Sequence, residues 1–216
     1  MASWAIHFRV ADWFLNKIQT LDQEYFLIGN IAPDCGVPVE GKREYDPPSI
    51  VTHRTNDGNK SDCDYSSIYN EFIRDETDVR KKSFFTGYFV HCMTDCLWAL
   101  ETCIPIEKTF GSFDMNRKLA KAVKKEWYNL DFTFFKNHIS PSFELFKTYK
   151  GFHEPYPDFY KNDEISRQMK NIVSFYASNK PVRMKYKYTT PEIVEKFVEQ
   201  TPQIIFDEIE KRDIEL

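Results

Sequence analysis

The chain has 216 residues and a formal net charge of -4, so it is long enough for one substantial domain and has no overall excess of positive charge. Aromatic residues make up 16% of it, with 19 Phe, whereas only 7 Gly are present. This composition favours a dense helical core over a turn-rich β fold. It argues against a protein that holds a nucleic-acid backbone through bulk charge, so we expect no nucleic-acid partner.

The sequence also bears on where the protein works. Asp12 interrupts the early apolar stretch, so no signal peptide is expected. No apolar run approaches the ~20 residues of a transmembrane span. The 5 cysteines form an odd count, which is typical of free thiols in a reducing compartment. We therefore expect a cytoplasmic protein without a transmembrane segment.

In the first third of the chain, the order of apolar and polar residues predicts short helices and one long loop. A helix is expected over residues 4–17 after Ser3, a candidate N-cap, and His7 lies on its apolar stripe. Residues 25–31 are consistent with a second short helix that ends in a turn. Residues 35–64 show no clear period and predict a long loop, which at this length is usually functional or disordered.

The rest of the chain predicts further helices. Residues 66–74 indicate a short helix, and a long helix is expected from Thr77 or Asp78 to about residue 100, with Pro105 beyond its end. Asp114 is the expected cap of a helix over 115–129, continuing to about 136. The core stripe expected for that helix is Met115, Leu119, Val123, Trp127 and Leu130.

Cap-then-proline signals mark the last helices. They predict a helix from Ser140–Pro141, and two short final helices from Thr190–Pro191 and Thr201–Pro202. Over residues 163–177, the helical spacing of apolar residues predicts another helix. No repeat and no linker interrupts the chain. The sequence therefore predicts a single all-α domain over residues 1–216, a compact multi-helix bundle.

His91 and Asp95 lie in a long apolar segment over residues 84–98. In a helix they share one stripe with bulky aromatic residues, so this stripe should face the interior. A buried carboxylate is costly without a positive partner, and no Lys or Arg lies between residues 83 and 107. A metal ion shared by an imidazole and a carboxylate one turn apart would explain the pair.

Five residues in apolar or turn contexts are candidate metal ligands: His7, Asp34, His53, His91 and Asp95. Three imidazoles and two carboxylates suit zinc, and also manganese or iron. Five ligands are more than one open tetrahedral site uses, but they fit a two-metal site with a bridging carboxylate. Two such metals can clamp a phosphate between them. Taken singly, His7 is better explained as a core residue and Asp34 as a turn residue, and His53 indicates little. The prediction therefore depends on their convergence in space.

Other candidates are weaker. Asp131 is an acid flanked by apolar residues, but an acid at a helix end explains it more simply. The thiols of Cys92, Cys96 and Cys103 share a helical face, yet their spacing exceeds the short Cys-x-x-Cys pattern of thiol metal sites and free buried Cys is common.

Four segments in a fixed order carry a resemblance: Trp4–His7, Phe26–Asp34, Thr52–His53 and Gly87–Asp95. Over about its first hundred residues the chain resembles the zinc-dependent phospholipase C family of bacteria, which is related in fold to the single-strand-specific zinc nucleases. The resemblance implies an all-helical fold with a metal cluster between helices. It also implies that Asp34, His53 and His91 bind one metal, and that Asp95 bridges to a second metal, which His7 also binds.

The same resemblance implies a function. A metal-activated water would attack a small phosphoester or a phospholipid headgroup, with Asp34 as the general base. The His-x-x-x-Glu pattern of a third zinc site is absent after His91, so one or two Zn²⁺ ions are expected. The alternatives are a non-catalytic metal-binding helical protein with an incomplete cluster, and a helical interaction protein without metal. The sequence does not indicate an oligomeric state.

Overall fold

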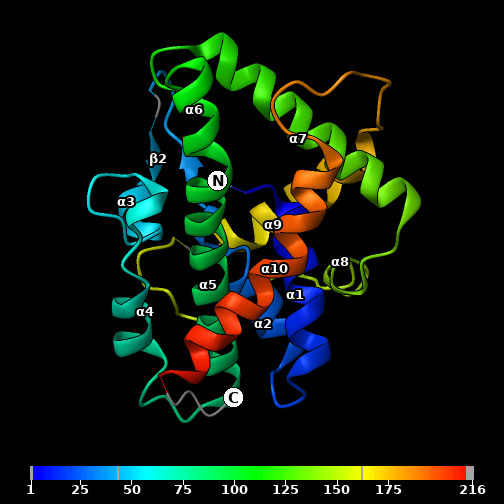
Figure 1. Ribbon diagram of the computed structural model, residues 1–216. Coiled ribbons are helices and arrows are strands. Elements are labelled where there is room, and N and C mark those ends of the chain that lie inside the picture. Colours follow the sequence, from blue (N-terminus) through cyan, green and yellow to red (C-terminus); the bar gives the residue numbers. More distant parts are fainter. Residues whose placement is uncertain (1, 43, 162, 213–216) are drawn as a thin grey trace.

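The fold is mostly helical, as the sequence predicted, and the computed structural model describes residues 2–42, 44–161 and 163–212 (Figure 1). A single small antiparallel sheet pairs β1 (Val37–Pro38) with β2 (Tyr45–Asp46) within these ranges. No helix among the described residues is both long and apolar enough to cross a membrane.

The long helix α5 (Val79–Trp98) lies at the centre of the fold (Figure 1). It begins where the sequence predicted, because the Asp78 side chain caps it by accepting a hydrogen bond from the Lys81 amide. Nearly every residue from Ser83 onward is buried. The metal-binding pair predicted on this helix therefore lies in the core.

The chain does not leave the helix before Pro105, contrary to expectation. A π-helical turn, η3 (Ala99–Cys103), joins α5 to α6 (Ile104–Phe110), and Pro105 stands in the first turn of α6. Proline lacks a backbone N–H group, so it removes one hydrogen bond at the point where α6 continues from η3.

Two helices from the start of the chain, α1 (Trp4–Lys17) and α2 (Gln23–Gly29), pack against α5. The contact with α2 is very close: a Cβ atom would lie 1.9 Å from the Phe84 carbonyl oxygen at Gly29, and 2.1 Å from the Phe26 carbonyl oxygen at Gly87. Only glycine allows backbones to approach this closely. The approach places the end of α2, and the short 3₁₀ helix η1 (Ala32–Asp34) after it, beside the middle of α5.

The segment predicted as one long loop contains short elements. They are the two strands, α3 (Ser49–Thr52) and the 3₁₀ helix η2 (Lys60–Asp62). α3 contacts η1, and η2 contacts α5, so the segment folds back over the middle of the central helix. α4 (Tyr65–Phe72) then packs on α5 as well.

The second half of the chain consists of α7 (Arg117–Asn137), α8 (Pro141–Phe146), α9 (Glu164–Ser178) and α10 (Pro191–Glu210). The start predicted for α7 was wrong. Asn116, not Asp114, caps the helix by accepting a hydrogen bond from the Leu119 amide. Met115 therefore precedes the helix and is 89% exposed, although the predicted stripe placed it in the core.

The prediction of a separate final helix was also wrong, because Thr201–Pro202 does not begin a new helix. α10 continues through Pro202, which lies inside it. A proline removes one hydrogen bond of a helix. The buried side chains of Val194, Phe197, Ile205 and Ile209 continue along the helix on both sides of Pro202, so packing offsets that loss.

Candidate metal centre

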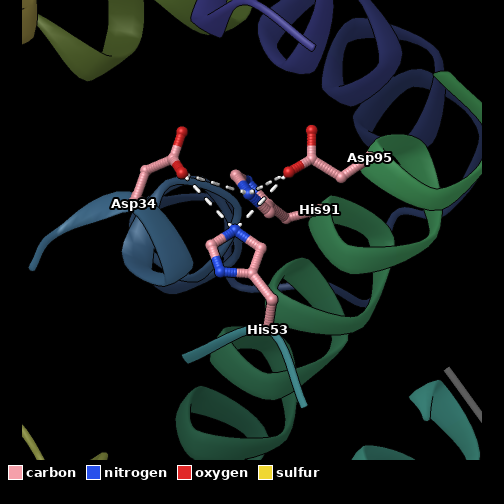
Figure 2. A group of neighbouring side chains, drawn as sticks. All are labelled: Asp34, His53, His91 and Asp95. Atoms are coloured by element: carbon pink, nitrogen blue, oxygen red, sulfur yellow. Dashed lines mark ion pairs between the residues drawn. The ribbon is translucent and has the colours of Figure 1, made fainter. Parts of the chain in front are cut away.

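Four of the predicted ligands converge in the core, from three separate parts of the chain (Figure 2). Asp34 ends η1, His53 follows α3, and His91 and Asp95 lie one turn apart on α5. Each offers one ligand atom, and these atoms all lie within 4.8 Å of one another. The convergence on which the sequence prediction depended is therefore present.

The distances between these atoms fit a common bound cation. The Nε2 atom of His53 lies 3.4 Å from Oδ1 of Asp34 and 3.5 Å from Oδ2 of Asp95. The Nε2 atom of His91 lies 3.9 Å and 3.7 Å from the same two oxygens. Four ligands at about 2.0–2.1 Å from a tetrahedral ion would lie roughly 3.3 Å apart. The group is thus slightly more open than a closed tetrahedral site.

Hydrogen bonds from the opposite ring nitrogens orient both imidazoles. Nδ1 of His91 lies 2.8 Å from the carbonyl oxygen of Asn30, to which it can only donate. Nδ1 of His53 lies 2.9 Å from the Thr52 hydroxyl. With Nδ1 engaged outside the centre, the Nε2 atom of each ring faces inward, and in His91 that atom carries the lone pair. Supporting hydrogen bonds of this kind accompany most histidine ligands of metals.

The carboxylates are held in the same manner, each by one oxygen. The Trp4 indole N–H donates to Oδ2 of Asp34 at 3.1 Å, and the Ala2 amide donates to Oδ1 of Asp95 at 2.6 Å. The other oxygen of each carboxylate faces the imidazoles (Figure 2). The N-terminal segment thus fixes both acids without occupying the centre.

The atoms that face the centre lack hydrogen bonds. Nε2 of His53, Nε2 of His91 and Oδ2 of Asp95 are buried and have no hydrogen-bond partner among the described residues. Buried polar atoms are normally paired, and each unpaired one costs about 1–3 kcal/mol. A cation at this point would satisfy all of them at once, so the donor set fits a divalent metal ion.

The protonation states also suit metal binding. Burial and the neighbouring His7 imidazole hold the pKa of His91 well below its usual range, so the ring is neutral. Burial by itself raises the pKa of the Asp34 carboxyl, but contacts with His53 and His91 outweigh burial and hold that pKa well below its ordinary value. Asp34 is therefore ionised.

His7, the fifth predicted ligand, lies beside the group rather than in it. Its ring stacks on His91, with ring centroids 3.9 Å apart, and its Nε2 atom lies 3.5 Å from Oδ1 of Asp95. Both nitrogens of His7 are buried without hydrogen-bond partners in the described part of the chain. His7 thus adjoins the outer oxygen of Asp95, where the predicted bridge to a second metal would lie.

Lys60 belongs to the centre but was missed in the sequence. Its ammonium group lies 3.4 Å from Oδ2 of Asp95 and is largely buried. Burial raises the pKa of the Asp95 carboxyl, but positive and hydrogen-bonding groups around it, Lys60 among them, hold that pKa well below its ordinary value. The sequence showed only that no lysine or arginine lies between residues 83 and 107, and Lys60 reaches Asp95 from outside that stretch.

The weaker candidates lie outside the group of four. Asp131 accepts hydrogen bonds from the Ser3 hydroxyl at 2.7 Å and the Tyr176 hydroxyl at 3.0 Å, one on each oxygen. Burial raises the pKa of Asp131 to about 7. The five cysteines are buried and free, and none belongs to a metal-binding group among the described residues.

A small cavity borders the centre at Asp34. It has a volume of about 30 Å³ and is lined by Trp4, Asp34, Lys124 and Tyr128, among others. That is room for roughly two water molecules. Asp34 is the only one of the four ligands that lines this cavity, so small molecules would meet it first.

Comparisons with known proteins do not identify a relative: no family model, no curated protein and no solved structure matches this chain. Its function is therefore inferred from the geometry and charge of the candidate metal centre.

Proposed function

We propose that the chain is a metal-dependent hydrolase of phosphoesters, similar to phospholipase C. The observation that carries the proposal is the convergence of four ligand atoms from η1, α3 and α5, of which those of His53, His91 and Asp95 are buried without a hydrogen-bond partner among the described residues. Zinc suits two imidazoles and two carboxylates, and manganese or iron is compatible with the same set. Bound there, the ion would polarise a phosphoryl oxygen and lower the pKa of a water molecule.

The charge of the centre supports an anionic substrate. Asp34 and Asp95 contribute two negative charges, and the Lys60 ammonium contributes one positive charge. With a divalent cation, these three side chains and the ion would together carry one net positive charge in a buried environment. Such a site attracts an anion such as a phosphodiester more strongly than a neutral ester.

Each side chain then has a task that follows from its position. His53, His91, Asp34 and Asp95 would hold the metal, and His7 would assist at the outer oxygen of Asp95. Asp34 borders the small cavity, so its carboxylate would also accept the proton of the attacking water.

Lys60 would contact the phosphate from its position beside Asp95. Its ammonium group has no hydrogen-bond partner among the described residues, although Asp95 is 3.4 Å away. A phosphoryl oxygen is a strong acceptor for such a group. The charge on Lys60 would then offset the negative charge that develops as the phosphoester is cleaved.

One observation favours a second function, a metal-binding protein without catalysis. The four ligand side chains are nearly inaccessible, and the adjoining cavity holds no more than a few water molecules. A structural or sensing metal needs no larger opening, whereas a hydrolase must admit its substrate.

Metal binding and hydrolysis can be measured on the same preparations. The protein is freed of metal with a chelator and loaded with zinc or manganese, and bound metal and hydrolysis of bis(p-nitrophenyl) phosphate are then recorded. The variant Asp95→Asn removes one ligand charge at constant shape. Asp131→Asn is the matched control, since Asp131 is an equally buried acid outside the group.

The wild type and the control should bind metal and hydrolyse the diester. Asp95→Asn should lose more than the roughly 10–100-fold in metal affinity that a lost supporting contact costs, together with the activity. Metal binding without turnover of any phosphoester would favour the non-catalytic function. Unchanged turnover in Asp95→Asn would contradict the proposed hydrolase function.

A further inference from the structure

A hollow of about 440 Å³ lies on the surface where α7 meets α9 and the segment after α9. In Figure 1 this segment, in orange, runs beside α7. The floor of the hollow is aromatic: the ring of Phe175 lies 5.1 Å from that of Tyr128 and 5.4 Å from that of Phe132, between centroids. All three rings are partly exposed. The floor therefore offers fixed aromatic edges and faces to a ligand.

The rim of the hollow is basic. Lys121, Lys124 and Lys125 of α7 line it, together with Lys180 after α9, and no acidic side chain does. None of these four lysines forms an ion pair with another described residue. In a chain whose net charge is -4, such a cluster is a local excess of positive charge. We call this hollow, with its aromatic floor and basic rim, the lysine groove.

Hydrogen bonds hold the wall of the lysine groove in place. The buried Asn129 side chain accepts a hydrogen bond from the Val182 amide at 2.7 Å, and its own Nδ2 donates one to the Tyr186 hydroxyl at 2.8 Å. These contacts tie the segment after α9 to α7. The groove is thus formed before any ligand arrives, as is usual for small-molecule sites.

The lysine groove adjoins the small cavity that borders Asp34. Lys124 and Tyr128 line both the groove and the small cavity that reaches Asp34. A ligand on the aromatic floor could therefore direct a phosphate past Lys124 toward the centre. The volume of the groove falls in the range of about 300–1,000 Å³ that is typical of pockets for small organic molecules.

We propose that the lysine groove binds the organic part of a small aromatic phosphoester, and that Lys124 directs its phosphate to the cavity at Asp34. The basic rim selects an anion, and the floor of Tyr128, Phe132 and Phe175 selects an aromatic group. That the anion is a phosphoester substrate rests on the function proposed above. The affinity of the groove for an aromatic anion does not depend on turnover.

Two phosphonates that no hydrolase can cleave as esters test the groove directly. Phenylphosphonate and methylphosphonate carry the same charged group and differ only in the ring. Their dissociation constants are measured by calorimetry on the zinc-loaded protein, on the double variant Lys125→Gln/Lys180→Gln, and on the control Lys196→Gln. Lys196 is an exposed lysine of α10 that does not line the groove. Melting temperatures confirm that each variant is folded.

Phenylphosphonate should bind the wild type at least about tenfold more tightly than methylphosphonate, because it adds a ring on an aromatic floor. The double variant should lose about tenfold for phenylphosphonate, and the control should lose nothing. Equal affinities for the two phosphonates, or wild-type affinity in the double variant, would overturn the proposal. So would lysine-dependent binding to vesicles of anionic phospholipid that phenylphosphonate fails to displace.

The two proposals fail separately. Lysine-dependent binding of phenylphosphonate without hydrolysis of any phosphoester would support the groove and overturn the hydrolase. Hydrolysis that depends on Asp95 but not on the groove lysines would overturn the groove and support the hydrolase.

Discussion

Buried carboxylates occur in two regions of the molecule, the metal centre beside α5 and the inner face of α7. On α7, Glu126 accepts three backbone amides, from Lys187, Tyr188 and Thr189, at 2.8–2.9 Å. Asp131, on the same helix, has a hydroxyl on each oxygen. Both oxygens of each of these acids therefore accept hydrogen bonds from within the fold.

The acids of the metal centre are used differently. Asp34 and Asp95 each receive one hydrogen bond from the N-terminal segment, and each turns its other oxygen toward imidazoles whose Nε2 atoms have no partner among the described residues. Burial alone therefore does not distinguish a site from a structural acid. The distinction lies in whether the buried oxygens already have donors, because an unsatisfied group persists at a cost of about 1–3 kcal/mol only where something else offsets that cost.

The largest expected effect is that of metal on stability. At free zinc about 1,000 times its dissociation constant, binding stabilises the folded state by about 4 kcal/mol. For a chain of this length that corresponds to a rise in melting temperature of about 8–16 °C. Differential scanning calorimetry with zinc and with a chelator should show this rise in the wild type and in Glu126→Gln, but not in Asp95→Asn. A rise of equal size in Asp95→Asn would mean that Asp95 does not bind the metal and does not differ in this respect from the acids of α7.

The sequence predicted the half of this contrast that lies on one helix. His91 and Asp95 could be assigned to a buried face of α5 because they and their aromatic neighbours repeat with the helical period, and the Asp78 cap was visible as well. The partners could not be assigned in the same way. His53 and Lys60 reach the centre only because the segment over residues 35–64 folds back across α5. The sequence of such an irregular segment has no hydrophobic periodicity from which its course could be predicted.

The same limit applies to α7 and α10. Buried acids on α7 look alike in the sequence, because their donors come from residues about 45 to 130 positions away, such as Tyr176 and Ser3 for Asp131. In α10, the cap-then-proline pattern at Thr201–Pro202 does not start a new helix, because the packing of side chains on either side of it keeps the helix continuous. Local chemistry predicted where helices begin more reliably than where they continue.

The second expected effect is a pH dependence that belongs to Asp131. Its folded-state pKa is about 7, above the ordinary value of 3.8, because it is buried. Between these two values the folded state holds a proton that the unfolded state has released, so stability falls as the pH rises through this window, by about 4 kcal/mol at most. Urea unfolding at pH 5 and pH 8 should show this fall in the wild type and a smaller one in Asp131→Asn. Parallel falls in the two proteins would show that Asp131 is ionised in the fold.

The third effect is a loss of stability without any loss of metal. In Glu126→Gln one of the two acceptor oxygens becomes an amide group that faces backbone N–H donors. Losing charged hydrogen bonds of this kind costs about 2–3 kcal/mol. Urea unfolding should show this cost, while zinc affinity stays at the wild-type value. A fall in zinc affinity would mean that the inner face of α7 supports the centre after all.

The smallest effect concerns the hydrogen bond that orients one imidazole. Thr52→Val removes the hydroxyl 2.9 Å from Nδ1 of His53, and only the more distant Ser49 hydroxyl, at 3.4 Å, then remains for that nitrogen. The ring can then turn or change tautomer, so zinc affinity should fall by about tenfold, at the lower end of the range for supporting contacts of metal ligands. Competition with a chromogenic chelator measures this directly.

Thr86→Val is the matched control for that change. It removes an equally buried hydroxyl, which donates to the Lys82 carbonyl oxygen within α5 and does not touch the centre. Both variants lose one hydroxyl from the core, so they should lose similar stability. Only Thr52→Val should lose zinc, because only its hydroxyl orients a ligand. Equal zinc affinities in the two variants would mean that Nε2 of His53 is directed by packing alone, or that His53 does not bind the metal.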